Sequence, residues 1–492
     1  MNVSRFSRYA ISICTASAIL AGCGGSQGQF GAPVAAQQRV VMAGHPARAQ
    51  LGMLHHKSGA GFTVSGRDIL HDGHRFFIKG VDYGSTNAGY SYYNAENKLV
   101  PSAPVANPLD DAYRGIWQPD LDLMRADGVN AVKVYNVSLK SFEGVPGYGK
   151  ATFQHPSKGE TGKIDEFLDA AWNNGNHPIY VVLSIFFEGA ALNDPSLTAT
   201  YGEFYRLMDK EYGAKPAVMG ISISSEINAA NYVRSSDWWK AFNTIDAAAK
   251  TGFAEAGNTQ RITTTTFVDG TISEGGKIVE EAPYFGTKFN STNDTWGLDI
   301  YRGPRLTPTH LWEQIAASTT KPTMLGEYGN PAGWFFRSTA KHSAQWHCID
   351  YSDPGTPEDV KELPDAASAN PNMQNLAEYV TGNQKDIFDN FMSSEAVTSG
   401  GFYFEFSDEW WKAGWSLKHI GGAGGHIPKN DQYAPCYNSE AWFGLYQDVP
   451  VGATYDDHGN LTDQPFPNGR KPDKRVPRQS VVDALSALWK AE

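Results

Sequence analysis

Two patterns of hydrophobic and polar residues alternate along the chain from about residue 61. Runs rich in β-branched and aromatic residues, such as residues 178–187, are typical of buried strands. In other segments, such as residues 163–175, apolar residues recur every three or four positions, which is typical of amphipathic helices. A hairpin is predicted first, with strands on either side of a turn at residues 71–74.

The alternation of these patterns predicts eight strands with helices between them. The predicted strands cover residues 75–84, 129–137, 178–187, 217–228, 261–270, 295–303, 321–329 and 399–411. The predicted helices cover residues 110–128, 163–175, 201–213, 236–257, 277–282, 309–319, 374–392 and 480–491. Pro119 marks a start or a kink in the first helix. We expect Ser235 or Ser236 to cap the helix at 236–257 and Gly257 to end it.

This alternation defines an α/β fold, and eight strands over about 430 residues is the count expected for a (β/α)8 TIM barrel. A doubly wound open sheet is the alternative. The first strand is not followed by a glycine-rich phosphate loop, which favours the barrel. Residues 331–371 and 416–475 are too irregular for the basic frame. We therefore predict one domain at residues 61–492 with long loop insertions near its C-terminal strands.

The N-terminus carries a predicted export signal at residues 1–22. Arg5 and Arg8 precede an apolar stretch that is too short to span a bilayer as a mature helix. Residues 20–23, Leu-Ala-Gly-Cys, resemble the lipobox of bacterial lipoproteins. The resemblance implies cleavage before Cys23 and attachment of a lipid to it, hence anchoring to a bacterial membrane, with the outer membrane expected. An ordinary signal peptide with an incidental cysteine is the alternative.

Composition narrows the possible partners and cofactors. Residues 23–60 are rich in glycine, glutamine and alanine at their start, which is typical of a flexible tether. The net charge of −12 argues against a nucleic-acid partner, and membrane contact is expected through the lipid anchor alone. Cys348 and Cys436 are expected to pair in an oxidising compartment. No spacing of cysteine or histidine predicts a metal site, and we expect no cofactor.

Two glutamates stand where apolar strands end. Glu226 ends the fourth predicted strand and Glu327 ends the seventh. In a (β/α)8 barrel the reactive groups lie at the C-terminal ends of the strands, around one mouth. Two carboxyl groups across such a mouth suit glycoside hydrolysis, because one can donate a proton while the other attacks the anomeric carbon. A structural ion pair near a loop is the alternative for either glutamate alone.

Several blocks together resemble the cell-wall β-1,3-glucanosyltransferases, which belong to the clan of retaining (β/α)8 glycosidases. The blocks are residues 76–84, 107–137, 220–228, 298–303 and 321–329. The resemblance implies that Glu226 is the acid/base, that Glu327 is the nucleophile, and that Tyr301 hydrogen-bonds the nucleophile. The clan usually has asparagine immediately before the acid/base, where this chain has Ser225. This departure indicates an altered substrate contact or an unusual linkage.

Other polar and aromatic residues near strand ends are expected to bind sugar. They are Asp82, Tyr83, Tyr135, Asn136, Glu188, Ser225, Asn228 and Tyr301, with Trp410, Trp411 and Trp415 after the eighth strand. In the clan, a tryptophan from strand eight commonly lies beneath the sugar in its subsite, so we expect one of the three to do so here.

The sequence therefore predicts a retaining β-glycoside hydrolase or transglycosylase that acts on an oligo- or polysaccharide of the β-glucan type. The alternative is a non-catalytic carbohydrate-binding lipoprotein on the same barrel. Ser225 favours this alternative, whereas the presence of both Glu226 and Glu327 opposes it. A third possibility is an amidase or other hydrolase, but the sequence lacks a metal-ligand cluster and a nucleophile-elbow motif.

Overall fold

A computed structural model describes most of the chain beyond residue 60. The described residues are 61–84, 86–87, 91–93, 99–101, 107–151, 155, 159–228, 231–330, 333–337, 346–350, 376–409, 443–454, 462, 466 and 469–492. The predicted signal, tether and lipidation site at Cys23 lie outside these residues, as do Trp410, Trp411, Trp415 and Cys436. Cys348 lies on a described strand, but its side chain is outside the description. The predicted disulfide therefore stays a prediction.

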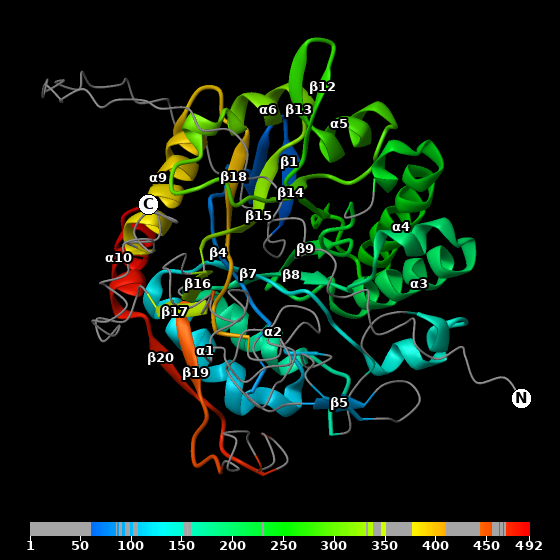
Figure 1. Cartoon of the computed structure of the whole chain (residues 1–492). Helices are drawn as coiled ribbons and strands as arrows, with labels where there is room; N and C mark the ends of the chain where they lie inside the picture. Colours follow the sequence, from blue (N-terminus) through cyan, green and yellow to red (C-terminus); the bar gives the residue numbers. More distant parts are fainter. Residues whose placement is uncertain are drawn as a thin grey trace, which may run out of the picture. The chain divides into compact units, whose positions relative to one another are not determined.

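The centre of the fold is a sheet of nine parallel strands (Figure 1). In sheet order the strands are β10 (Ile262–Thr264), β9 (Val218–Ser222), β8 (Tyr180–Ser184), β7 (Ala131–Lys133), β4 (Ile78–Asp82), β18 (Thr398–Tyr403), β15 (Thr323–Tyr328), β14 (Trp296–Asp299) and β11 (Thr266–Val268). Strands β10 and β11 are two halves of one predicted strand, separated by Thr265. Because β10 pairs with β9 and β11 pairs with β14, the sheet closes on itself. The predicted (β/α)8 barrel is confirmed.

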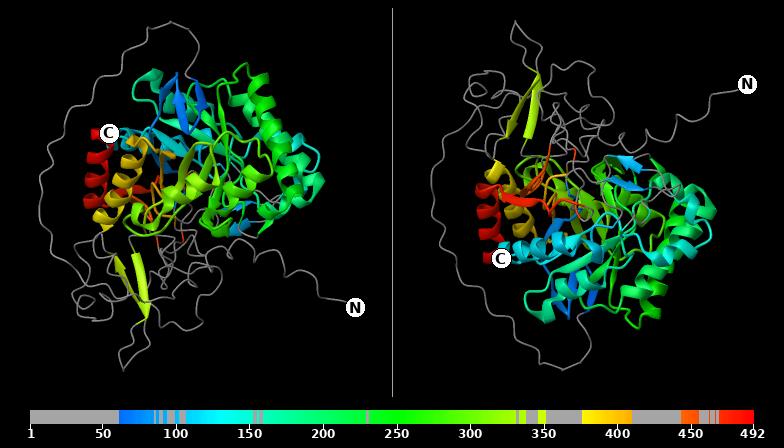
Figure 2. Two further views of the ribbon diagram at one scale, coloured as in Figure 1. Left: turned by 90° about the horizontal axis from the view of Figure 1, so that it is seen from above. Right: turned by 90° about the horizontal axis from the view of Figure 1, so that it is seen from below.

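Helices surround the barrel. They are α1 (Arg114–Asp127), α2 (Asp165–Trp172), α3 (Pro195–Tyr212), α4 (Ser236–Glu255), α5 (Glu281–Lys288), α6 (Leu311–Ser318), α9 (Leu376–Met392) and α10 (Gln479–Ala491). Helices α3 and α4 pack side by side on one flank of the barrel, and α9 and α10 on the other (Figure 2). Ser235 caps α4, and Gly257 follows the helix with a φ of +77°. None of the described helices is long and apolar enough to cross a bilayer.

Short 3-10 helices lie in the connecting segments. They are η2 (Asp111–Tyr113), η3 (Lys140–Gly144), η4 (Tyr148–Lys150), η5 (Asn173–Gly175), η6 (Gly189–Asn193), η7 (Tyr232–Arg234) and η8 (Thr307–Thr309). The connections also contain antiparallel strand pairs. These are β5 (Ser91–Tyr93) with β6 (Leu99–Pro101), β16 (Gly333–Arg337) with β17 (Trp346–Asp350), and β19 (Tyr446–Val449) with β20 (Lys474–Pro477). The two predicted insertions therefore contain regular strands as well as loops.

The predicted helix at residues 277–282 is wrong in its first part. Strands β12 (Thr271–Glu274) and β13 (Lys277–Glu280) form a hairpin, and helix α5 begins only at Glu281. Gly275 and Gly276 form the turn with φ values of +58° and +79°, which most other residues adopt at a cost. The β-branched Ile278 and Val279 also favour a strand over a helix.

A second hairpin closes the N-terminal end of the barrel. It is built from β1 (Phe62–Ser65), β2 (Asp68–His71) and β3 (His74–Arg75). Phe62 and Ile69 of this hairpin pack with residues near the starts of the barrel strands, such as Ile78, Ala131 and Met324. We call this group the inner core, and the larger cluster between the sheet and the helices the outer core. The hairpin therefore fills the N-terminal end of the barrel.

Phe62 tests how much this hairpin stabilises the barrel. Its ring centroid lies 4.8 Å from that of Tyr180 and 5.2 Å from that of Phe76. We expect Phe62→Ala to lower the free energy of unfolding by about 3–5 kcal/mol, because it leaves a cavity in the inner core. Val64→Ala, on the same strand at a side chain that is 37% exposed, should change it by less than about 0.5 kcal/mol. Urea denaturation followed by circular dichroism measures both, and equal midpoints for the two variants would contradict a stabilising role.

Candidate active site

A β-bulge turns Glu327 into the barrel mouth. On β15, Leu325 is opposite Leu298 of β14, but Asp299 is opposite Glu327, so Gly326 is an extra residue on β15. Leu325 belongs to the outer core, and strict alternation would send Glu327 to that same side. The extra residue reverses the alternation, as bulges do next to functional sites. Glu327 consequently lies on the inner side, next to Asp299.

Two tyrosines hold the carboxylate of Glu327. The hydroxyl of Tyr135, which follows β7, donates to Oε1 at 2.5 Å. The hydroxyl of Tyr301, which follows β14, donates to Oε2 at 2.8 Å. The hydrogen bond that the family resemblance implied for Tyr301 is therefore present. Hydrogen bonds to both oxygens fix the orientation of the carboxylate.

Two buried phenylalanines support these tyrosines. Phe404 lies with its ring centroid 6.2 Å from Tyr135 and 5.1 Å from Phe443, and Phe443 lies 5.8 Å from Tyr301. All three pairs are close to edge-to-face, which is a favourable arrangement for aromatic rings. Phe404 directly follows β18, so the eighth strand helps to position both donors to Glu327.

Glu226 lies on the loop after β9 and not on the strand itself. The strand ends at Ser222, and the chain then turns through Ser224 and Glu226, which have φ values of 59° and 47°. The backbone N–H of Glu226 donates to Oγ1 of Thr266 at 3.2 Å. The hydroxyls of Ser225 and Thr266 are 2.8 Å apart and share a hydrogen bond. Thr266, at the start of β11, thus holds the turn that carries Glu226.

Glu226 and Glu327 come together with a third carboxyl group that sequence reasoning missed. Carboxylate oxygens of Glu226, Asp299 and Glu327 all lie within 4.8 Å of one another. Retaining glycosidases hold their two carboxyl groups about 5–5.5 Å apart, whereas inverting enzymes need about 6.5–9.5 Å. The spacing between Glu226 and Glu327 allows one carboxylate to attack an atom while the other protonates its leaving group.

The same three carboxyl groups are the residues of this site that could bind a divalent cation. Two observations argue against a bound cation at this place. The oxygens of Glu327 already accept hydrogen bonds from tyrosines, and the ammonium of Lys133 lies close enough to repel a second positive charge. We therefore attribute the charge balance of the site to Lys133 and to bound protons.

Lys133 and Asp82 form a fully buried ion pair beneath the mouth. The Nζ of Lys133, the last residue of β7, lies 3.0 Å from Oδ1 of Asp82, the last residue of β4. The ammonium also lies 4.1 Å from the ring centroid of Tyr135. Burial alone would lower the pKa of Lys133, but the carboxyl groups of Asp82, Glu327 and Asp299 together raise it. Lys133 is thus charged and serves several carboxyl groups at once.

Three predicted sugar-binding residues have other partners. Asp82 is fully buried and paired with Lys133, so it supports the site from below. Tyr83 points away from the mouth, because side chains alternate along a strand, and its hydroxyl donates to Asp120 of α1 at 2.9 Å. The amide of Asn228 exchanges two hydrogen bonds with the backbone of Val268, at 2.9 and 3.2 Å. These contacts are structural, and a sugar-binding role for the three residues stays a prediction.

Other predicted residues remain near strand ends. Oδ1 of the buried Asn136 accepts a hydrogen bond from the backbone N–H of Phe186 at 3.2 Å. Glu188 is exposed on the segment after β8. Ser225 is buried at the turn before Glu226. A sugar-binding role for them stays a prediction.

The residues that were missed left different signals in the sequence. Asp299 ends the sixth strand and Lys133 ends the second as the structure bounds them, so the strand-end rule could have found both. Phe404 and Phe443 left no such signal, because aromatic residues in this chain serve mostly in the core.

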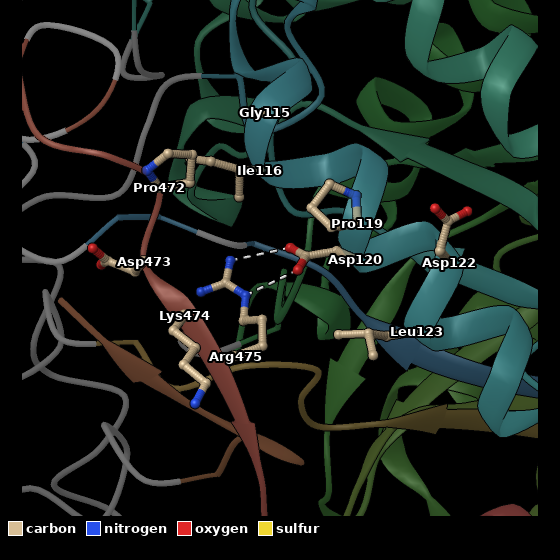
Figure 3. Close-up of a pocket in the computed structure, with 10 residues that line it drawn as sticks. All are labelled: Gly115, Ile116, Pro119, Asp120, Asp122, Leu123, Pro472, Asp473, Lys474 and Arg475. Atoms are coloured by element: carbon tan, nitrogen blue, oxygen red, sulfur yellow. Dashed lines mark hydrogen bonds and ion pairs between the residues drawn. The ribbon is translucent and has the colours of Figure 1, made fainter. Parts of the chain in front are cut away.

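A separate concavity of about 470 Å³ lies between α1 and the segment that leads into β20 (Figure 3). Its lining includes Ile116 and Leu123, and it includes none of the strand-end carboxyl groups of the mouth. Figure 3 shows Arg475 pointing at Asp120, to which it donates two hydrogen bonds of 3.0 Å each. Arg475 also pairs with Asp448. The polar groups at the centre of this concavity are thus engaged in ion pairs that join α1 to the C-terminal strands.

Comparisons with known proteins give no family assignment. No family model matches the chain, and no curated protein matches it. Among solved structures, the chain is similar to a GH2 β-galacturonidase from Eisenbergiella tayi, with 11% identity and a TM-score of 0.45 over 88% of this chain and 54% of that one. It is also similar to a β-glucuronidase from Ruminococcus gnavus, with 12% identity and a TM-score of 0.46 over 88% and 53%. The chain thus spans about half the length of these proteins, and similarity at this level assigns no function to it.

Lys133→Met tests the charge balance of the site. The variant leaves the buried carboxyl of Asp82 without its ammonium partner, so we expect it to lower the free energy of unfolding at pH 7 by about 3–5 kcal/mol. The double variant Asp82→Asn, Lys133→Met removes both charges and should recover part of this loss. Urea denaturation measures all three proteins. A Lys133→Met variant as stable as the wild type would mean that Lys133 does not offset these carboxyl groups.

Proposed function

We propose that the protein is a retaining β-glycoside hydrolase or transglycosylase that acts on a polysaccharide of the β-glucan type. The observation that carries the proposal is the separation of less than 4.8 Å between carboxylate oxygens of Glu226 and Glu327 at the barrel mouth. This separation suits a double displacement, in which no water molecule has to fit between the second carboxylate and the sugar. The two tyrosines on Glu327 add support, because a nucleophile must be held in a fixed orientation.

In the first step, an oxygen of Glu327 attacks the anomeric carbon and forms a covalent ester bond to the sugar. Glu226 donates its proton to the glycosidic oxygen as the bond to the leaving sugar breaks. In the second step, Glu226 takes a proton from an incoming hydroxyl, whose oxygen displaces Glu327 from the anomeric carbon. The configuration is inverted twice and thus retained.

The incoming hydroxyl decides between the two activities. Water gives hydrolysis, and a hydroxyl of a second sugar gives transglycosylation, with the same residues in the same roles. The β-glucan class rests on the resemblance of residues 74–330 to glucanosyltransferases, and on Glu188 and Tyr301 near strand ends, of which Glu188 is exposed and Tyr301 partly exposed.

One observation favours a second candidate, a carbohydrate-binding protein without catalysis. Ser225 stands where the clan usually has asparagine, and its buried hydroxyl shares a hydrogen bond with Thr266, which leaves it less able to bind a sugar 2-hydroxyl. Loss of that contact weakens transition-state stabilisation. The candidate predicts binding of a polysaccharide with no cleavage.

Substitution of the two glutamates tests the enzymatic proposal. On a panel of β-glucans and mannans we expect Glu226→Gln to lower turnover by about 10²–10⁴-fold, because the leaving oxygen loses its proton donor. Glu327→Gln should lose at least as much, because no covalent intermediate can form. Glu313→Gln, an exposed glutamate on α6, should keep wild-type turnover.

The wild-type product should appear first in the β-anomeric form in proton NMR spectra. First appearance as the α-anomer would exclude the double displacement. If the wild type binds a polysaccharide without cleaving it, and both glutamine variants bind it equally well, the carbohydrate-binding candidate is correct.

We propose further that the protein acts while anchored by a lipid at Cys23 to a bacterial membrane, with the outer membrane expected. In a bacterial host the wild type should incorporate labelled palmitate and sediment with membranes. Cys23→Ser should incorporate none and appear in the soluble exported fraction, whereas Cys14→Ser, within the predicted signal, should behave as the wild type does. Equal incorporation by wild type and Cys23→Ser would mean that Cys23 is not the attachment site.

A further inference from the structure

Asp299 is a buried carboxyl group at the site to which the two-glutamate reaction assigns no part. It is the last residue of β14, lies opposite Glu327 across the strand pair, and is only 2% exposed. Neither of its carboxylate oxygens has a hydrogen-bond partner among the described residues. A buried charged carboxylate without hydrogen bonds would cost several kcal/mol, so its charge state needs an explanation.

The groups that face Asp299 come from four neighbouring parts of the barrel. They are Glu327 on β15, Lys133 on β7, Glu226 on the loop after β9, and Asp82 on β4. Burial is the first cause that raises the pKa of Asp299 well above its usual range, and the Glu327 carboxyl is the second. Glu226 and Asp82 act in the same direction, and Lys133 only partly offsets them.

The backbone makes room for this side chain. A Cβ atom added at Gly326, the extra residue of the bulge, would lie 2.3 Å from Oδ1 of Asp299 and 2.7 Å from Cγ2 of Thr266. Asp299 therefore fills a space that the bulge of β15 leaves open, between the segments that carry Glu226 and Glu327. A side chain with this position lies beside both glutamates, with a carboxylate oxygen within 4.8 Å of one oxygen of each.

We propose that Asp299 is a positioning residue that works as a neutral, proton-bearing acid: it fills the space beside Glu226 and Glu327 without adding a negative charge there. The inference rests on the proposed function, in which Glu327 attacks the anomeric carbon and Glu226 transfers a proton, because both steps depend on the charge nearby. The alternative is a third ionised carboxylate that acts as a base or as a cation ligand.

The stability of Asp299→Asn tests the charge state without any substrate. Above about pH 4 the unfolded wild-type chain releases this proton while the folded protein keeps it, so the wild type loses stability as pH rises and the amide variant does not. The melting temperature of Asp299→Asn minus that of the wild type should therefore increase by about 2 °C or more between pH 5 and pH 8. A difference that stays constant over this range would mean that Asp299 is ionised in the fold, and would overturn the proposal.

Asp209 provides a matched control. It is a fully buried aspartate on α3 whose oxygens also lack hydrogen-bond partners in the described part of the chain, and burial followed by Asp246 raises its pKa well above the usual range. Asp209→Asn should show the same dependence of the melting temperature on pH. Because it is not at the mouth, it should leave the pH profile of activity unchanged.

The pH profile of kcat/KM tests the role at the site. If Asp299 is neutral, Asp299→Asn removes no charge. The apparent pKa values of the acidic and alkaline sides of the kcat/KM profile should then stay within about 0.3 pH units of those of the wild type. The value of kcat/KM itself should stay within about threefold. Asp299→Ala should lower kcat by about 10–10²-fold, because it leaves a space beside both glutamates, and the asparagine variant should rescue this loss.

Two results would overturn the proposal in this second test. If both apparent pKa values of the kcat/KM profile fall by about 1 unit in Asp299→Asn, the substitution has removed a negative charge. A loss of more than about 10²-fold in a folded Asp299→Asn protein would show that the carboxylate itself takes part in the chemistry. If no polysaccharide is cleaved at all, the proposed function fails, and the melting experiment alone decides the charge state of Asp299.

Discussion

The structure of this site depends on one electrostatic constraint: three carboxyl groups at the barrel mouth, and a fourth beneath it, lie near the buried ammonium of Lys133. Asp82 is paired with Lys133, and Glu327 is hydrogen-bonded on both oxygens by tyrosines. Asp299 has no hydrogen-bond partner among the described residues, and it is the group to which we assign the proton that relieves the repulsion. The carboxyl groups of this site thus stand in different environments: Asp82 is in an ion pair, Glu327 accepts hydrogen bonds from two tyrosines, and Asp299 has no hydrogen-bond partner among the described residues.

Backbone irregularities, more than regular strands, place these groups. The extra residue at Gly326 turns Glu327 inward and makes room for Asp299. The chain turns through positive φ values at Ser224 and Glu226 after the fourth strand has ended, and the backbone N–H of Glu226 donates to Thr266 at the start of β11. Conformations of this kind cost free energy and persist where the surrounding structure enforces them, which is common at functional sites.

The apolar hairpin and the cluster of carboxyl groups occupy opposite ends of the barrel. The N-terminal end is closed by an apolar hairpin that contributes Phe62 and Ile69 to the inner core. The C-terminal end carries buried charges that destabilise the fold unless they are paired or protonated. The packed end and the outer core must therefore offset the cost of the charged end. This division explains why polar residues of the mouth, such as Asp82, can remain buried.

The sequence by itself determined the eight-strand alternation, the order of strands and helices, and the two glutamates at the ends of strands four and seven. These are local properties, since periodicity of two or 3.6 residues and a strand-end carboxylate are visible in one segment at a time. Only the tertiary structure decided which strand-end residues share the mouth. The bulge in β15, the outward turn of Tyr83 and the burial of Asp299 depend on register between strands far apart in the chain. Register is set by pairing and packing across the closed barrel, and no single segment encodes it.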